Sequence, residues 1–395
     1  MKIGILLGEI PPPVFIEQLI KQLVLKECKI ILYGKINKKK ADFYLRGVKI
    51  RKTPPNKLFS ITLFIYLLIR GVLKYKIQFI SILYKIRHRE SNIKNSIIRF
   101  NKIVRPLMDN LDIFHIQWAK SIAHYPDFLN YINCPLVLSL RGTHINVSPI
   151  TDEKIAEKYK HYFPKIDGFH AVSNAIAQKA VKYGADTKKI HIIYPAVDEN
   201  ILNIENNAHY KSKDTLEIIS IGRCHWIKGY TNALDAMHIL NKEGVDFHYT
   251  IIASGEDEEN LLFQISDLNL KEKVTFINGA EHRQVLKKLL DSHLFLLPSF
   301  EEGISNSLLE AMALGIPSIS TECGGIPEVI NHGENGYIIP VGCSVSIVKA
   351  VKEFMNTDSK KHLEMISKAK KKIKISHLLS QQTDEILELY NSLIK

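Results

Sequence analysis

The chain has 395 residues, enough for two domains that each bury a core, and its 46% hydrophobic and 24% charged residues are ordinary for a folded protein. Five scattered cysteines without a CxxC pair argue against a disulfide framework and against a zinc site. The start runs directly into a short apolar strand and lacks the apolar core and cleavage site of a signal peptide, so we expect a cytoplasmic protein.

The formal net charge is +12, and the basic excess is concentrated in one region. Between residues 35 and 105 the only acids are Asp42 and Glu90. The apolar run Leu58 to Ile69 is too short to span a bilayer. The basic-apolar segment 57–105 fits a surface that lies on an anionic membrane, and it fits an ordinary helix of a lysine-rich protein equally well. We expect no nucleic-acid partner, because no known nucleic-acid-binding motif accompanies the charge.

Short apolar runs and helical patterns alternate through the first 200 residues. Lys2 to Leu7 predicts a strand, Val14 to Leu25 a helix, and Lys29 to Tyr33 a second strand. This order is typical of the start of a doubly wound α/β sheet. The segment 57–105 is predicted to be helical. Further strands are predicted at residues 112–118, 135–140, 166–172 and 190–194.

Polar side chains stand at two of these strands. His115 could face a ligand, or it could be satisfied inside its own sheet. Arg141 to His144 directly follow the strand 135–140, and groups at the carboxyl end of such a strand face the ligand crevice. We therefore expect Arg141 and His144 in a cleft. Arg141 is always charged and cannot act as a base, but it could pair with phosphate or an anionic acceptor, whereas His144 could supply an imidazole.

The polar stretch Glu199 to Asp214 predicts a linker to a second domain. There, a strand from Leu216 to Ile221 runs into the turn Gly222 to Gly229, and a helix follows. The glycines permit a tight turn and close approach of the backbone. Arg223 and Lys228 could neutralise a diphosphate. Arg223 could do so through two parallel hydrogen bonds, and Lys228 as a point charge. A solvated basic turn is the alternative.

The next predicted strands, Tyr249 to Ala253 and Val274 to Ile277, lead into Gly255 and Asn278. A short buried strand follows at Leu294 to Leu297. Beyond it lie a turn containing Gly303, a helix that begins at about Asn306 and is ended by Gly315 and Pro317, and another strand at Ser318 to Thr321. Terminal helices are predicted from about Val345.

The turn and helix around Gly303 have the layout of an anion site, because a strand, a glycine turn and a helix start aim free backbone N–H groups at one point. Glu302 and Glu310 flank this point, and eight residues of helical rise would separate them by about 12 Å. A ligand that reaches both must be long, with hydroxyls at its ends and negative charge between, like a nucleoside-diphosphate sugar. The alternative is one surface acid and one unrelated helix acid.

Three runs together resemble the signature of the retaining group 1 glycosyltransferases, also called glycosyltransferase family 4. They are Glu302 and Glu310 followed by Ala-Met-Ala-x-Gly-x-Pro, Gly-Arg-x4-Lys-Gly from Gly222, and Gly-Gly-x-Pro-Glu from Gly324. The nearest likeness is to bacterial exopolysaccharide-type members. The resemblance implies the GT-B fold, in which two Rossmann-like domains face each other across a cleft. The expected parts are an acceptor-binding domain at 1–200, a nucleotide-sugar-binding domain at 201–375, and a helix at 376–395 that packs back on the first domain.

The resemblance also implies roles for single residues. Glu302 would contact the donor sugar, and Glu310 would hold the ribose. Relatives often carry His-Gly-x-Asp where Arg141 to His144 stand, so Arg141 and His144 are expected to act near the reacting end of the sugar. The remaining donor-binding residues are expected to be Gly222, Arg223, Lys228, Gly255, Asn278, Gly303, Ile304 and Ser305. Neither a metal nor a cofactor is implied, since the nucleotide sugar is a co-substrate.

The expected function is retaining transfer of a sugar from a nucleoside-diphosphate sugar to a glycan or lipid-linked glycan, in the synthesis of a bacterial surface polysaccharide. A GT-B sugar-nucleotide epimerase and a non-catalytic partner of another glycosyltransferase are the alternatives. The segment 57–105 suggests peripheral contact with the cytoplasmic membrane.

Overall fold

The computed structural model describes residues 1–37, 43–54, 57–75, 77–90, 92–124, 128–206 and 215–394. The chain forms two compact units, each built on one parallel sheet. Unit 1 comprises Met1–Ala171, Ala177–Ile192 and Thr383–Lys395, and unit 2 comprises Val172–Ile176 and Ile193–Gln382. Part of the predicted linker, 207–214, lies outside the described residues. The predicted α/β class with two Rossmann-like folds is confirmed.

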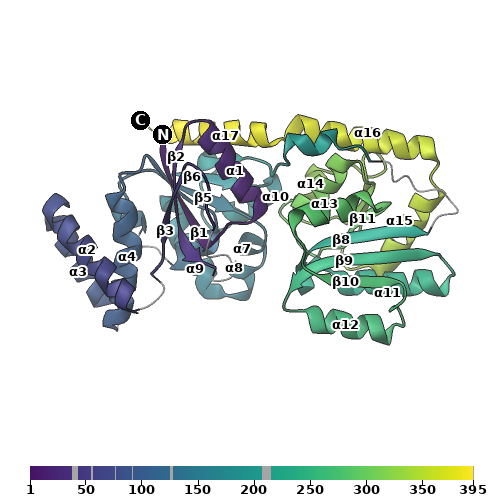
Figure 1. Ribbon diagram of the computed structural model, residues 1–395, viewed down its shortest axis with the longest axis horizontal. Helices are drawn as coiled ribbons and strands as arrows, with labels where there is room; N and C mark the ends of the chain where they lie inside the picture. The colour runs from purple at the N-terminus through teal and green to yellow at the C-terminus, as the bar shows by residue number, and fades with distance from the viewer. Residues whose placement is uncertain are drawn as a thin grey trace. The chain divides into compact units, whose positions relative to one another are not determined.

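Unit 1 contains a parallel sheet whose described strands run in the order β3-β2-β1-β4-β5-β6-β7 (Figure 1). The order reverses between β1 and β4, and at such a switch point a crevice opens at the carboxyl ends of the strands. The strand bounds are β1 Lys2–Ile10, β2 Lys29–Ile36, β3 Val48–Lys52, β4 Ile113–Ile116, β5 Leu136–Leu140, β6 Gly168–Ala171 and β7 Ile190–Ile192.

Helices cover this sheet with apolar stripes. α1 (Val14–Leu25) buries Ile16, Leu19, Ile20 and Leu23, the spacing that places four side chains on one helix face. Further helices of this half are α5 Ala119–His124, α6 Phe128–Tyr131, α7 Thr143–Asn146, α8 Ser148–Thr151, α9 Glu153–Tyr162 and the later parts of α10 Asn174–Val181 and α17 Leu379–Leu393.

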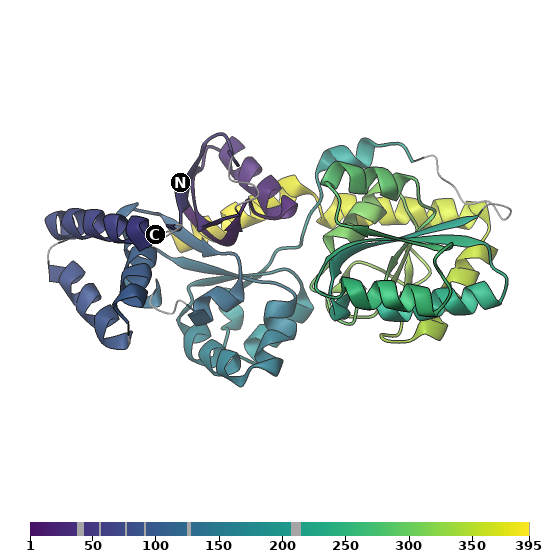
Figure 2. The same ribbon diagram turned by 60° about the horizontal axis from the view of Figure 1, so that its bottom comes forward.

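The basic-apolar segment forms three helices that lie side by side beyond the β3 edge of the sheet (Figure 2). They are α2 Lys57–Tyr75, α3 Ile77–Arg89 and α4 Ile93–Met108. They share a small core of their own, formed by Leu67, Ile82, Ile86, Phe100, Ile103 and Val104. No described helix, α2 included, is both long and apolar enough to cross a membrane.

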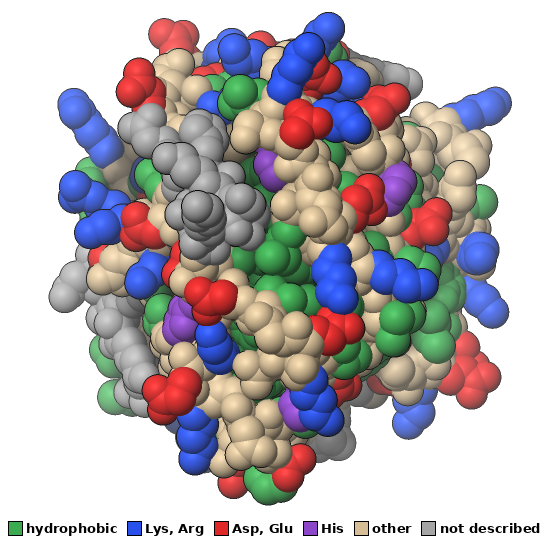
Figure 3. All heavy atoms as spheres, turned by 90° about the vertical axis from the view of Figure 1, so that its right-hand side faces the viewer, with side chains coloured by type: hydrophobic (Ala, Val, Ile, Leu, Met, Phe, Trp, Pro, Cys, Tyr) green, Lys and Arg blue, Asp and Glu red, His purple; other side chains and the backbone are tan. Residues whose placement is uncertain are grey.

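Unit 2 repeats the plan, with described strands in the order β10-β9-β8-β11-β12-β13 and a switch point between β8 and β11. The strand bounds are β8 Leu216–Cys224, β9 Phe247–Gly255, β10 Val274–Asn278, β11 Leu294–Leu297, β12 Ser318–Thr321 and β13 Tyr337–Ile339. The helix bounds are α11 Tyr230–Lys242, α12 Glu258–Asp267, α13 His282–Leu290, α14 Asn306–Leu314, α15 Ser344–Asn356 and α16 Ser359–Ser376. Figure 3 shows acidic and basic side chains interspersed over one face of this unit, so the basic excess is not gathered there.

Candidate active site

The loops that follow β8 and β11 meet at the switch point of unit 2. The Phe300 N–H donates to the Ile227 carbonyl at 2.7 Å, which ties the two loops together. Gly229 has a φ of +65°, and a Cβ there would lie 2.0 Å from the Pro298 carbonyl oxygen. Only glycine allows this approach. The backbone thus holds the Gly222–Gly229 turn directly against the turn that carries Glu302.

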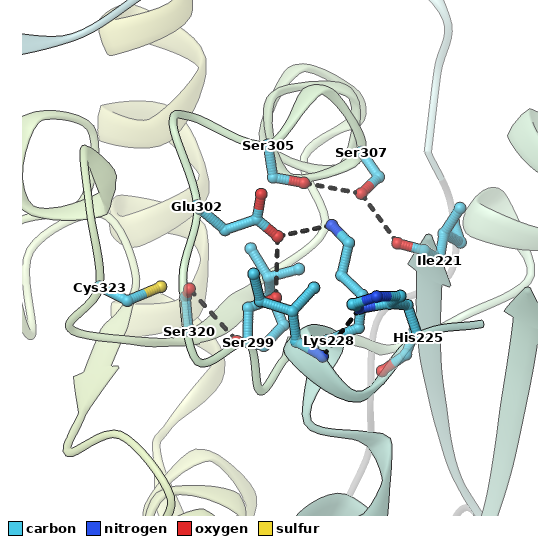
Figure 4. A network of polar contacts seen from close by, with 12 residues as sticks. Ile221, His225, Lys228, Ser299, Glu302, Ser305, Ser307, Ser320 and Cys323 are labelled. Carbon is cyan, nitrogen blue, oxygen red and sulfur yellow. Dashed lines mark hydrogen bonds and ion pairs between the residues drawn. The ribbon is translucent and has the colours of Figure 1, made fainter. Parts of the chain in front are cut away.

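Lys228 and Glu302 form an ion pair across these two loops (Figure 4). The Lys228 Nζ lies 2.5 Å from Glu302 Oε1, and the Ser299 hydroxyl donates to the same oxygen at 2.8 Å. Both charged side chains are nearly buried, with 11% and 12% of their surfaces exposed. A Cβ at Gly222 would lie 3.0 Å from Lys228 Cε, so glycine leaves the lysine its path to the carboxylate.

The start of α14 is open to a ligand. Among the described residues, the N–H groups of Gly303, Ile304 and Ser305 donate to no acceptor. The Ser305 hydroxyl does not cap the helix but contacts the Ser307 hydroxyl at 3.0 Å, and Ser307 Oγ donates to the Ile221 carbonyl at 3.1 Å (Figure 4). Unclaimed amides at the positive end of a helix bind anions. The turn therefore offers the free backbone N–H groups that an anion site at this position requires.

The loop after β12 lies against the same turn. The Gly325 N–H donates to the Gly303 carbonyl at 2.7 Å. A Cβ at Gly324 would lie 1.8 Å from the Glu302 carbonyl oxygen, and one at Gly325 would lie 2.3 Å from the Gly303 carbonyl oxygen. These distances explain the paired glycines, since any side chain would displace the backbone that carries Glu302.

Two further residues belong to this site but were not predicted. Tyr230, the first residue of α11, is buried, and its hydroxyl has no hydrogen-bond partner among the described residues. Burial raises its pKa well above the ordinary value, so it is a neutral donor. A Cβ at Gly222 would lie 2.8 Å from the Tyr230 oxygen, so the glycine leaves room beside this hydroxyl. No sequence pattern marks a tyrosine of this kind.

The second unpredicted residue is His282, the first residue of α13, whose Nε2 lies 2.7 Å from Glu310 Oε1. This hydrogen bond raises the pKa of His282, although burial opposes the shift. Glu310 is partly buried on α14 and thus has a partner before any ligand binds. A lone histidine at a helix start gave no signal in the sequence.

This pair predicts a pH-dependent contribution to stability. A folded-state pKa above the unfolded value means that the stabilisation is complete below the unfolded pKa and is lost as pH rises through the folded pKa. His282→Gln should therefore lower the melting temperature more at about pH 5.5 than at about pH 8.5, on either side of the ordinary histidine range. Differential scanning fluorimetry at both pH values measures this difference. An equal loss at both would show that the ionised pair does not form.

The other predicted donor residues lie at the same sheet edge but outside this cluster. Gly255 and Asn278 end the neighbouring strands β9 and β10. The Asn278 amide donates to Glu258 at 2.5 Å, which turns its side chain toward α12. Arg223 is exposed on β8. No contact of the described residues joins Arg223 to the Lys228–Glu302 pair.

In unit 1, Arg141 follows β5 as predicted. Its guanidinium donates to Gln117 Oε1 at 3.2 Å and lies 5.1 Å from the ring centre of Phe15. Its Nε is buried without an acceptor, and no carboxylate of the described residues pairs with it. Burial lowers the pKa of Arg141 to about 10, which still leaves it charged at neutral pH. His144 lies in α7, its ring 5.5 Å from that of Trp118.

The structure decides between the two interpretations of His115. Its ring is fully buried, with Nδ1 at 2.6 Å from the Tyr390 hydroxyl and Nε2 at 2.8 Å from Ser139 Oγ. Burial lowers its pKa to about 3, so the ring is neutral. His115 is satisfied by β5 and α17 of its own unit and does not face a ligand.

The family models match nearly the whole chain. "Glycosyltransferase Family 4" matches residues 14–201, and "Glycosyl transferases group 1" matches residues 203–372. The two doubly wound sheets have the architecture of GT-B glycosyltransferases: the Anabaena HepE structure with UDP and glucose aligns over all of both chains with a TM-score of 0.74 at 16% identity. The chain belongs to the group 1 glycosyltransferases of family 4, and it is a glycosyltransferase.

Relatives of low sequence identity are also glycosyltransferases. The amylovoran biosynthesis glycosyltransferase AmsK of Erwinia amylovora is 27% identical over 74% of this chain and 73% of its own length. The putative colanic acid biosynthesis glycosyltransferase WcaL of Escherichia coli K12 is 29% identical over 71% of this chain and 70% of its own. The TarM structure aligns with a TM-score of 0.74 at 15% identity, over 99% of this chain and 98% of its own.

Proposed function

We propose that this glycosyltransferase moves a sugar, with retention at the anomeric carbon, from a nucleoside-diphosphate sugar to a glycan or lipid-linked glycan of a bacterial surface polysaccharide. The observation that carries the proposal is the Lys228–Glu302 pair beside three unclaimed amides at the start of α14. Cation, amides and carboxylate are the groups that a diphosphate joined to a sugar requires.

Ligand binding would exchange the partners of this ion pair. Lys228 would turn its charge to the diphosphate, and Glu302 would accept hydrogen bonds from sugar hydroxyls. The Tyr230 hydroxyl, which now lacks a partner, could donate to a phosphate oxygen. Because each group gains a ligand contact as it loses a protein contact, the buried charges stay satisfied throughout. Glu310 would make the same exchange, from His282 to the ribose.

The chemistry needs stabilisation of the leaving group. As the bond from the anomeric carbon to phosphate breaks, negative charge grows on the diphosphate, where Lys228 and the α14 amides stabilise it. Glu302 orients the sugar as positive charge develops on it. The departing phosphate oxygen would take the proton of the acceptor hydroxyl on the same face, which gives retention without an enzyme nucleophile. We propose that neither a metal nor a cofactor takes part.

Two relatives support a surface polysaccharide as the product, since AmsK and WcaL are named for amylovoran and colanic acid biosynthesis. Membrane contact through segment 57–105 is part of the proposal and would place the enzyme on the cytoplasmic membrane. α2 supports it with an outward apolar stripe that includes Leu58, Ile65, Ile69 and Leu73. Apolar side chains beside basic ones suit an anionic bilayer surface.

A ligand panel tests the donor class. Calorimetry with UDP-, GDP- and ADP-sugars should give a dissociation constant of roughly micromolar for one nucleotide, while CMP-sialic acid, which has a single phosphate, should not bind. Incubation of the bound donor with lipid-linked glycans should release the nucleoside diphosphate. Binding of none of the diphosphate sugars would refute the proposal. A new sugar formed from donor alone would point to the epimerase alternative.

A further inference from the structure

A separate cavity lies in unit 1, at the carboxyl ends of β1, β2 and β3. It has a volume of about 780 Å³, and α2 and α4 form its outer wall. The strand ends contribute Leu6 to Gly8, Tyr33 to Lys35 and Arg51 to Thr53. Figures 1 and 2 show that these helices lie beside the β3 edge of the sheet. The cavity is large enough for a small-molecule ligand.

Among the described residues, the cavity is lined by cations and by no Asp or Glu. Seven of the described lining residues are basic: Lys35, Arg51, Lys52, Lys57, Lys94, Lys102 and Arg105. The nearby Asp109 is already occupied, because it forms an ion pair with Arg51 and accepts a hydrogen bond from Tyr33 at 2.7 Å. The described lining of the cavity therefore carries more positive than negative charge.

Arg105 is the cation that most clearly lacks a negatively charged partner among the described residues. One guanidinium nitrogen donates to the Lys52 carbonyl at 2.6 Å, and no carboxylate of the described residues pairs with it. Partial burial lowers its pKa, and the neighbouring Arg51 lowers it further. Two partly buried arginines with one acid between them favour an additional anion, and arginine binds phosphate through two parallel hydrogen bonds.

Apolar side chains of the two helices also line the cavity, beside polar ones such as Ser60 and Asn101. α4 contributes Ile93, Ile97 and Ile98, and α2 contributes Ile61 and Leu63. Free phosphate would gain nothing from these side chains, and it would leave most of the cavity unfilled. A phosphate joined to an apolar chain would use both parts, since burial of the chain against these side chains adds to the binding.

We propose that this cavity binds the diphosphate of a lipid together with the first part of its apolar chain. The inference deepens the proposed function and rests on it only in naming this lipid as the carrier of the acceptor glycan. The apolar stripe of α2 next to the cavity would rest on the bilayer from which the lipid enters. An acceptor held here would have its phosphates in the cationic part and its chain against α2 and α4.

Farnesyl diphosphate, inorganic diphosphate and farnesol are suitable probes for calorimetry on the full chain. Farnesyl diphosphate should bind at least about tenfold more tightly than inorganic diphosphate, because only the first buries a chain. Arg105→Gln should weaken both diphosphates by about tenfold. Ile61→Ser should weaken farnesyl diphosphate alone. Lys85→Gln on α3, which does not line the cavity, is the matched control and should change neither.

Two controls distinguish binding in this cavity from binding at the α14 site of unit 2. All titrations are repeated in Lys228→Gln, which is expected to impair diphosphate binding at α14. Nucleoside-diphosphate binding is measured for each cavity variant as a check of folding. Equal affinity for the two diphosphates would show a site for free phosphate and would refute the lipid as its ligand. Unchanged affinity in both Arg105→Gln and Lys52→Gln would refute this cavity as the diphosphate site. Donor binding that persists in either case would leave the proposed function intact.

Discussion

Glu302→Gln is expected to lower the rate of sugar transfer by roughly a hundredfold to a thousandfold at saturating donor, the range seen when one preorganised polar group is removed from an active site. Glutamine keeps the shape but removes the negative charge. Lys228 loses the partner that holds it 2.5 Å away, and the Ser299 hydroxyl faces a weaker acceptor. The developing positive charge on the sugar is no longer opposed. Release of nucleoside diphosphate in the presence of acceptor measures the rate.

A matched variant shows whether charge at this position is what matters. Glu322→Gln removes an exposed carboxylate from the loop after β12, and this side chain forms no hydrogen bond or ion pair among the described residues. It should keep the wild-type rate. If Glu302→Gln is folded, as judged by its melting curve, and also transfers at the wild-type rate, Glu302 has no part in catalysis.

Lys228→Gln is expected to lower kcat by roughly a hundredfold and to weaken donor binding, because the leaving diphosphate loses its buried cation. The variant also removes the cation beside the nearly buried Glu302 carboxylate, so its melting temperature should fall. The comparison variant is Lys242→Gln, at the exposed last residue of α11, the helix that follows the Lys228 turn. It should change neither quantity.

The double variant of Lys228 and Glu302 tests whether the two act as one unit. Residues in direct contact deviate from additivity by about 0.5–3 kcal/mol. The double variant should therefore lose much less activity than the product of the two single losses, and it should melt at a higher temperature than either single variant. Strictly additive effects would mean that the ion pair is not coupled in solution.

Elements with a strong local pattern were predictable from sequence. The helix at Val14–Leu25 and the strands at Leu294–Leu297 and Ser318–Thr321 have the predicted bounds. The edge strand β3 was missed, because its basic residues are exposed or only partly buried and interrupt any apolar run. β13 was missed because three residues are too few to show a period.

The part of the site that depends on backbone conformation was predictable, because such a conformation requires glycine at particular positions. Glycine turns and a helix start placed Lys228 and Glu302 in one site, although 74 residues separate them. The pairing itself could not be read from the chain, since it depends on how two loops stack. His282 and Tyr230 were missed for the same reason: a side chain that gains its role from a tertiary neighbour has no local signature. Arg141 was predicted to lie in a ligand cleft, and its hydrogen bond to Gln117 was not predicted.

The stacked glycines have a consequence for protein engineering. Gly229 touches the backbone at Pro298, and Gly324 touches the backbone at Glu302, so three loops from three strands are fitted to one another without intervening side chains. In a chimera that takes one loop from a relative, the different backbone conformation of that loop would clash with the two loops packed against it. Exchanging donor preference between such enzymes should therefore succeed when residues 222–229, 298–305 and 322–328 are transplanted as a single cassette.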